Sequence, residues 1–202
     1  MKSAPRVRVR GTVRFAEQKC KESNMKMDEV FTEVFGDGDM LVNKALVFED
    51  RGDYFAVVGY NGEDERLIVP SWYKYKPVEE IAEGVFAGRE CIERVTIGDN
   101  IKRIGKDAFS GCVSLVEANI PNAIESIGAG AFSGCASLKS ITIPASVEEI
   151  GAGAFSGFSG FRAYCYVSKK PDGWADDWLP KDAKVEWQGA SALLDELLSL
   201  FD

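Results

Sequence analysis

The sequence contains no histidine among its 202 residues. Histidine is the base of Ser-His-Asp and Cys-His catalysis and a ligand of most catalytic metal sites, including the H-E-x-x-H zinc site, so these chemistries are excluded. The glycine-rich Gly128-x-Gly130-x-x-x-Gly134 misses the dinucleotide-binding spacing by one residue, and Gly105-Lys106 lacks the Ser or Thr of a phosphate loop. We therefore expect a protein that is not an enzyme, with no catalytic residue, cofactor or metal site.

Long hydrophobic runs are also missing. No window approaches the roughly 18 consecutive apolar residues of a membrane span. The N-terminus carries Arg6, Arg8 and Arg10 but no apolar stretch behind them, which is not the pattern of a signal peptide. These observations predict no membrane partner and a cytoplasmic location, or an extracellular one if a natural leader has been replaced.

Basic residues are in the minority, with 24 Lys and Arg against 32 Asp and Glu and a formal net charge of −8. Such an excess of acid disfavours unspecific binding to nucleic acid or to an anionic membrane. Hydrophobic residues make up 46% of the chain and charged residues 28%, which is the composition of a folded globular protein.

What the sequence does contain is a 23-residue repeat, marked by Phe86, Phe109, Phe132 and Phe155. Apolar residues and glycines around each phenylalanine recur at the same interval. The recurring apolar triplets are Ile92, Val95, Ile97; Leu115, Ala118, Ile120; Leu138, Ile141, Ile143; and Phe161, Tyr164, Tyr166. This period and the spacing L-x-x-L-x-L are typical of leucine-rich repeats. A single coil has no second layer to bury its apolar side chains, so the copies must stack into a solenoid.

The segment from Leu138 to Gly157, LKSITIPASVEEIGAGAFSG, resembles the consensus of the BspA-type leucine-rich repeat family. Four copies, covering about residues 78–167, carry the resemblance. It implies a curved, bacterial-type solenoid used for protein recognition, and it implies no catalytic residues.

Five cysteines, an odd number, lie at Cys20, Cys91, Cys112, Cys135 and Cys165 without any C-x-x-C pair. Cys112 and Cys135 share one repeat position, so their coils should lie about 4.8 Å apart. That separation permits a disulfide, but a column of reduced, buried thiols is the favoured interpretation. It agrees with a reducing compartment.

The fold class expected from these patterns is α+β, mostly β: a leucine-rich-repeat solenoid with a small N-terminal α+β cap and a C-terminal Trp-rich cap. The expected boundaries are 1–65 for the N-terminal unit, 66–167 for the solenoid, 168–190 for the C-terminal cap and 191–202 for a short amphipathic helix. The N-terminal unit should contain a strand near 7–15, a helix over 27–35, and two strands, 46–48 and 54–60, around the turn at 50–53.

The C-terminal cap and tail each have an expected role. The cap holds three of the four tryptophans, which should cover the apolar end of the last coil. The tail places Leu193, Leu194, Leu197, Leu198 and Phe201 at helical spacing. Because a helix this short is marginal alone, it should dock on the cap, with self-association through a second copy as the alternative.

Candidate binding residues fall in two places. Pro144 is followed by Val147 after three residues, whereas Pro70 reaches Val78 after eight, so five residues are inserted near 71–76. This loop holds Trp72, Tyr73 and Tyr75, residue types that dominate binding hot spots; packing against the N-terminal unit is the equal alternative. The outward strand positions are expected to be Arg94, Glu117, Ser140, Ala163 and Thr96, Asn119, Thr142, Cys165. Of these, Arg94, Thr96, Glu117, Asn119 and Thr142 are candidate partner contacts.

A further candidate is the basic strand of Arg6, Arg8, Arg10 and Arg14, which fits either a phosphate backbone or a solvated edge protected by its charges. The leading functional hypothesis is a non-catalytic protein-binding module. The alternatives are a nucleic-acid-directed protein, through this strand or through an acidic body that mimics nucleic acid, and thirdly a secreted adhesin-like protein.

Overall fold

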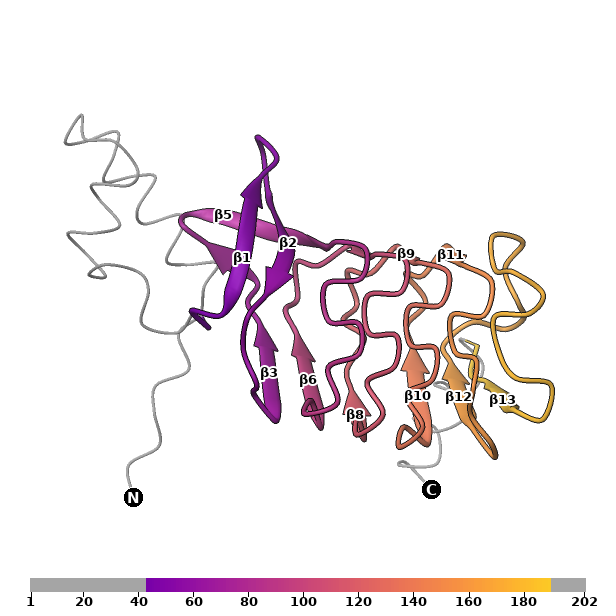
Figure 1. Ribbon diagram of the computed structural model, residues 1–202. Helices are drawn as coiled ribbons and strands as arrows, with labels where there is room; N and C mark the ends of the chain where they lie inside the picture. The colour runs from indigo at the N-terminus through magenta and orange to yellow at the C-terminus, as the bar shows by residue number, and fades with distance from the viewer. Residues whose placement is uncertain (1–42, 190–202) are drawn as a thin grey trace, which may run out of the picture.

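The structure is a computed structural model that describes residues 43–189, and all regular elements in this range are strands. The chain winds through stacked coils, and most coils contribute one strand to each of two sides (Figure 1). We call the first side the strand face. It consists of β3 (Arg66–Val69), β6 (Arg94–Ile97), β8 (Glu117–Ala118), β10 (Ser140–Ile143), β12 (Arg162–Cys165) and β13 (Lys184–Trp187).

The other side is a continuous sheet, which we call the second sheet. Its parallel part contains β5 (Lys76–Ile81), β7 (Arg103–Ile104), β9 (Ser126–Ile127) and β11 (Glu149–Ile150), paired in that order. The register places Ile81, Ile104, Ile127 and Ile150 opposite one another. The mostly-β solenoid predicted from the repeat is thus confirmed.

The four phenylalanines of the repeat form a stacked column in the core. All four are fully buried, and successive ring centroids from Phe86 to Phe155 lie 4.9, 5.1 and 5.3 Å apart, with the rings nearly parallel. Tyr60 extends the column at the N-terminal end, where its ring centroid lies 5.3 Å from that of Phe86. Trp178 contacts it at the other end, 5.9 Å from Phe155. Each coil therefore buries its aromatic ring only by stacking on its neighbours.

Glycines let neighbouring coils approach closely after β7, β9 and β11 of the second sheet. A Cβ atom on Gly105 would lie 2.6 Å from the main chain of Ala82 and Glu83, and one on Gly128 or Gly151 would meet the preceding coil in the same way. No side chain fits at such a distance. The glycine that follows each of these strands is therefore required by backbone packing.

The N-terminal strands belong to the same stack. β1 (Leu46–Asp50) and β2 (Phe55–Tyr60) form the predicted antiparallel hairpin, and β2 then pairs in parallel with β5, with Phe55 opposite Val78. The sheet therefore runs across the boundary expected at residue 65. The expected helix at 27–35, the basic strand of Arg6, Arg8, Arg10 and Arg14, and the C-terminal tail lie outside the described residues.

The five-residue insertion folds as a hairpin of β4 (Trp72–Tyr73) with the start of β5. Lys74 and Tyr75 form its turn with φ values of 40° and 52°. Positive φ at both central residues is the geometry of a two-residue turn that matches strand twist, although Asn-Gly is the usual sequence. The solenoid is undisturbed, because Arg66 still pairs with Arg94, 23 + 5 = 28 residues later.

The C-terminal cap forms one further coil. β13 pairs in parallel with β12, Trp174 bridges to Ile150 on the second sheet, and the Trp174 and Trp178 side chains are buried. The indole Nε1 of Trp174 donates to the carbonyl of Val147 at 3.1 Å. The expected Trp-rich cover therefore repeats the backbone path of the coils beneath it.

One expected orientation is wrong. Tyr164 and Tyr166 were predicted to point inward, and Ala163 and Cys165 outward, but Ala163 and Cys165 are fully buried and Tyr166 is 39% exposed. The cause is a coil that is one residue shorter, because Ser140 pairs with Arg162, 22 residues later rather than 23. A shift of one residue along a strand moves every side chain to the other face of the sheet.

Candidate protein-binding face

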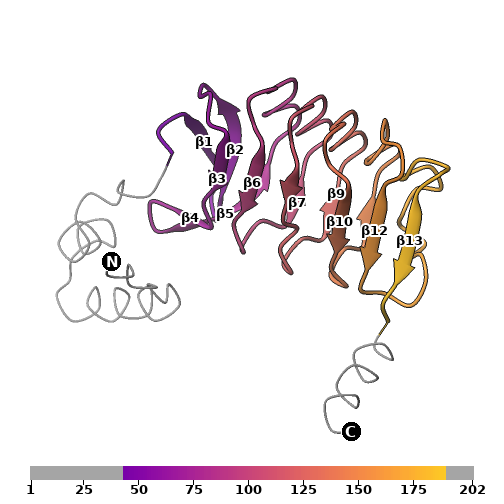
Figure 2. The same ribbon diagram turned by 90° about the horizontal axis from the view of Figure 1, so that it is seen from below.

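The strand face consists of two three-stranded sheets, β3-β6-β8 (labelled in Figure 1) and β10-β12-β13 (labelled in both Figure 1 and Figure 2). The break falls at β8, where strand pairing ends after Ala118. There the side chain of Asn119 replaces the ladder: its Oδ1 accepts from the Ile97 amide at 2.6 Å, and its Nδ2 donates to the Ile97 carbonyl at 3.0 Å. Asn119, a candidate contact by sequence, thus has a structural role.

Two rows of side chains project from the strand face. The first outward column consists of Arg66, Arg94, Glu117, Ser140, Arg162 and Lys184. The second outward column consists of Ile68, Thr96, Asn119, Thr142, Tyr164 and Glu186. Tyr164 is half-buried and all the others are exposed. The structure therefore brings five of the sequence candidates, Arg94, Thr96, Glu117, Asn119 and Thr142, onto one surface.

The first outward column is basic, with four cations and one carboxylate, although the whole chain carries −8. Arg94 lies 3.6 Å from Glu117, and Arg162 lies 3.7 Å from Glu186 in the second column. All four side chains are about half exposed, so each pair contributes about 0–1 kcal/mol. Among residues 43–189, no carboxylate lies within ion-pair distance of Arg66 or Lys184.

The aromatic hairpin divides into a structural and an exposed part. The Tyr73 ring stacks on Phe48 with centroids 4.0 Å apart and meets Phe55 edge-on at 5.0 Å. Lys76, directly after the turn, ties the hairpin to β1, because its Nζ lies 2.8 Å from both carboxylate oxygens of Asp50 and holds the pKa of that carboxyl below its usual value. The hairpin thus seals the first coil.

Of the three predicted aromatic contacts, Tyr73 is therefore a packing residue. Trp72 is half-buried opposite Pro77, and Tyr75 is 41% exposed at the turn. Tyr75 and the exposed part of Trp72 are what this hairpin offers to a partner.

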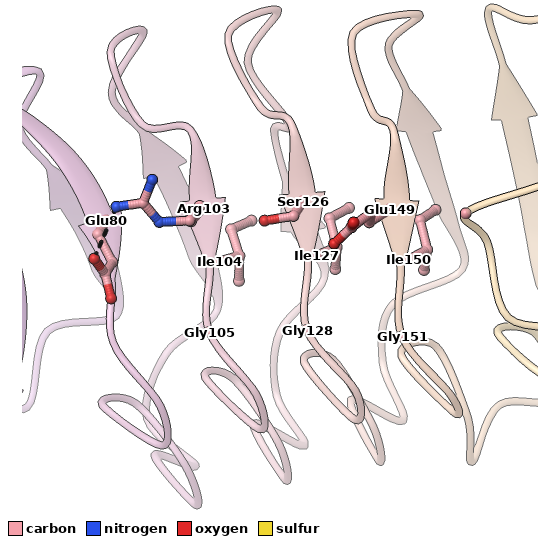
Figure 3. A pocket seen from close by; sticks show the side chains of 11 residues that line it. Glu80, Arg103, Ile104, Gly105, Ser126, Ile127, Gly128, Glu149, Ile150 and Gly151 are labelled. Carbon is pink, nitrogen blue, oxygen red and sulfur yellow. Dashed lines mark hydrogen bonds and ion pairs between the residues drawn. The ribbon is translucent and has the colours of Figure 1, made fainter. Parts of the chain in front are cut away.

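A groove of about 350 Å³ runs along the second sheet and is lined by residues 103–105, 126–128 and 149–151 together with Glu80 and Gly173 (Figure 3). Its polar groups at one end already bind each other. Arg103 Nη2 lies 3.0 Å from Glu80 and 2.8 Å from the Tyr54 hydroxyl, and the hydrogen bond with Glu80 raises the pKa of Arg103. The neighbouring Lys102–Glu79 pair, 2.9 Å apart, forms a second ion pair between the same two coils.

Three of the four described cysteines, Cys112, Cys135 and Cys165, are buried in the core. No cluster of His, Cys, Asp or Glu within residues 43–189 has the arrangement of a metal site. Cys112 and Cys135 are fully buried and free, and their thiols donate to the carbonyls of Phe86 and Phe109, each at 3.1 Å. Burial raises the pKa of the Cys165 thiol to about 12. These thiols are suited to filling space and not to nucleophilic chemistry.

Parallel stacked coils, a phenylalanine column and a polar strand face define a leucine-rich-repeat solenoid. Residues 75–166 match the family model described as BspA type Leucine rich repeat region (6 copies). The resemblance inferred from the repeat consensus is thereby confirmed. Comparison with curated proteins gives no match.

Solved structures of leucine-rich repeat proteins share the fold. One from Bacteroides capillosus is 26% identical, with a TM-score of 0.56 over 62% of this chain and 96% of that one. One from Bacteroides ovatus is 25% identical, with a TM-score of 0.56 over 72% of this chain but only 37% of that one. A third, from T. pallidum, is 22% identical with a TM-score of 0.53, over 79% of this chain and 94% of that one, and shows the fold alone.

Six residues of the strand face escaped prediction: Arg66, Ile68, Arg162, Tyr164, Lys184 and Glu186. Arg66 and Ile68 alternate with Leu67 and Val69, an alternation that marks them as outward. Lys184 likewise alternates with Val185 and Trp187. Arg162 and Tyr164 carried no such signal, because the shortened coil disguised their register. Within the described range, no helix is long and apolar enough to cross a membrane.

Proposed function

We propose that this chain is a non-catalytic protein-binding module and that its strand face is the contact surface. The observation that carries the proposal is the pair of outward columns, which present twelve side chains on two neighbouring hydrogen-bonded sheets. The repeat family supports a role in protein interaction. The second sheet offers less, because the charged groups at one end of its groove bind one another.

Arginine and tyrosine are enriched in binding hot spots, and the strand face carries both types. The three strands β10, β12 and β13 pair over four residues each, which fixes the directions of Arg162 and Tyr164. Side chains on a pre-ordered surface lose little conformational entropy on binding. The exposed turn residue Tyr75 would add a contact at the N-terminal end of the solenoid.

Site-specific photocrosslinking tests this function. A photoreactive phenylalanine replaces Thr142 on the strand face or, in the matched control, Glu148 beside the second sheet; both positions are exposed. In cells of the source organism, we expect a covalent conjugate with another protein from position 142 and none from 148. Conjugates from 148 alone, or from neither position, would contradict the proposed surface.

A further inference from the structure

We propose that the partner contributes an extended acidic segment, which lies along the first outward column and runs parallel to the solenoid axis. This inference rests on the proposed function and names the chemistry of the partner. The contact groups are the guanidinium groups of Arg66, Arg94 and Arg162 and the ammonium group of Lys184. Carboxylates match guanidinium groups in both charge and geometry.

Two like-charged pairs lie directly opposite each other in the ladders. Arg66 faces Arg94 across β3 and β6, and Arg162 faces Lys184 across β12 and β13. Like charges at directly opposed positions destabilise a sheet. Glu117 and Glu186 offset one member of each pair, Arg94 and Arg162, whereas no carboxylate of residues 43–189 lies within ion-pair distance of Arg66 or Lys184. Carboxylates of a partner would remove the repulsion.

The spacing of the two pairs suggests the form of the partner. Arg94 and Arg162 are separated by three coil steps, through β8 and β10, or about 14 Å at about 4.8 Å per step. An extended chain advances about 3.3 Å per residue, so acidic residues four or five positions apart would meet both pairs. Glu117 and Ser140 lie between the pairs and offer no cation there. The second outward column supplies Thr96, Thr142 and Tyr164 as a polar and aromatic floor.

The charge of the opposite surface sets the side on which such a segment binds. Glu125, Glu148 and Glu149 are exposed beside the second sheet, and Asp172 is exposed in the cap loop. They repel an acidic chain from that side. The net charge of −8 also disfavours a long polyanion such as nucleic acid, whereas a short acidic segment needs only the local column.

The test is fluorescence anisotropy at low ionic strength with the full chain and a labelled peptide of about 12 residues, extended at about 3.3 Å per residue. The peptide carries a pair of glutamates near each end, and a second probe carries lysines in their place. We expect the wild type to bind the glutamate peptide and not the lysine peptide. The charge reversal R162E/K184E should weaken glutamate-peptide binding at least about 10-fold.

The matched control is K169E/K181E, which changes the net charge equally at two exposed lysines of the cap and should weaken binding less than about 2-fold. The milder variant R162S/K184S is the control for misfolding. Serine is compatible with this column, because Ser140 already occupies the equivalent position in β10. This variant should lose affinity while its melting temperature stays the same or rises.

Several results would overturn the acidic partner: no binding of the glutamate peptide, equal loss in both charge-reversal variants, or tighter binding of a single-stranded oligonucleotide than of the peptide. If position 142 forms a photocrosslinked conjugate but the glutamate peptide does not bind, only the acidic segment is ruled out. Absence of that conjugate would remove the proposed function itself.

Discussion

Phe132 lies in the middle of the core column, with the rings of Phe109 and Phe155 5.1 and 5.3 Å away on its two sides. Its side chain is fully buried. Phe132→Ala should lower the free energy of unfolding by about 3–5 kcal/mol, because it removes the ring and leaves a cavity between two coils. Equilibrium denaturation measures the change. Val113→Ala, at a residue 40% exposed, is the control; a loss below about 1 kcal/mol for Phe132→Ala would mean that the column is not packed.

Tyr60 has a different role at the N-terminal end of this column. Its hydroxyl donates to Asp64 at 2.7 Å, and burial, with this hydrogen bond, raises the pKa of Tyr60 from 10.0 to about 12. Because the folded pKa exceeds the unfolded one, the protonated phenol favours folding. This contribution is complete below about pH 10 and is lost as pH rises toward about 12.

We therefore predict that stability falls between about pH 10 and 12 and that Tyr60→Phe reduces this fall. At neutral pH the variant should cost about 2 kcal/mol, because it removes two hydrogen bonds, one donated to the Asp64 carboxylate and one accepted from the Asp64 amide. Denaturation at several pH values, with tyrosinate absorbance as the titration signal, checks both effects. A parallel pH profile in wild type and variant would contradict the assigned pKa.

At the scale of single elements, the inserted hairpin separates packing from binding. Tyr73→Ala should cost about 2 kcal/mol, because the Tyr73 ring contacts both Phe48 and Phe55. Tyr75→Ala should change stability by less than about 0.5 kcal/mol, since this side chain is exposed at the turn. Thermal melts of the two variants measure this difference in stability. Equal melting temperatures for both would show that the hairpin does not seal the first coil.

The sequence predicted those elements whose residues recur at a fixed interval. Phe86 to Phe155 at 23-residue spacing specify stacked coils, and the distance from Pro70 to Val78 specifies the insertion. The sequence did not predict the register of β12. The coil is one residue short after Phe161, and without that residue Ala163, Tyr164, Cys165 and Tyr166 fit either the buried or the exposed face of the strand equally well. Only packing against Ile141 and Ile143 settles which of them are buried.

The strand face was predicted in its central strands and missed at its ends. Arg94, Thr96, Glu117 and Thr142 project as expected. The flanking basic residues are Arg66 in β3 and Lys184 in β13. The segment of β3 was assigned to an end of the solenoid, and that of β13 was assigned to a cap. A cap that repeats the backbone path of a coil has no recurring phenylalanine or glycine to reveal it. Pairing of β13 with β12 is therefore visible only in three dimensions.

For the whole molecule, the state of the cysteines reports the compartment. We predict that all five thiols, including Cys20 outside the described residues, react with a thiol reagent in denaturant without reductant. Burial protects Cys112, Cys135 and Cys165 in the folded protein, so their reaction should require unfolding. A count of three reactive thiols would reveal a disulfide, most simply Cys112–Cys135, and would contradict the expected reducing location.

The proposed function depends on which side of the solenoid contacts the partner. Amide chemical-shift mapping with the protein captured through position 142 tests this most directly. We predict that the perturbed amides cluster in β10, β12 and β13, around Arg162, Tyr164 and Lys184, while β9 and β11 remain unchanged. Perturbations confined to Ser126, Glu149 and their neighbours on the second sheet would contradict the account.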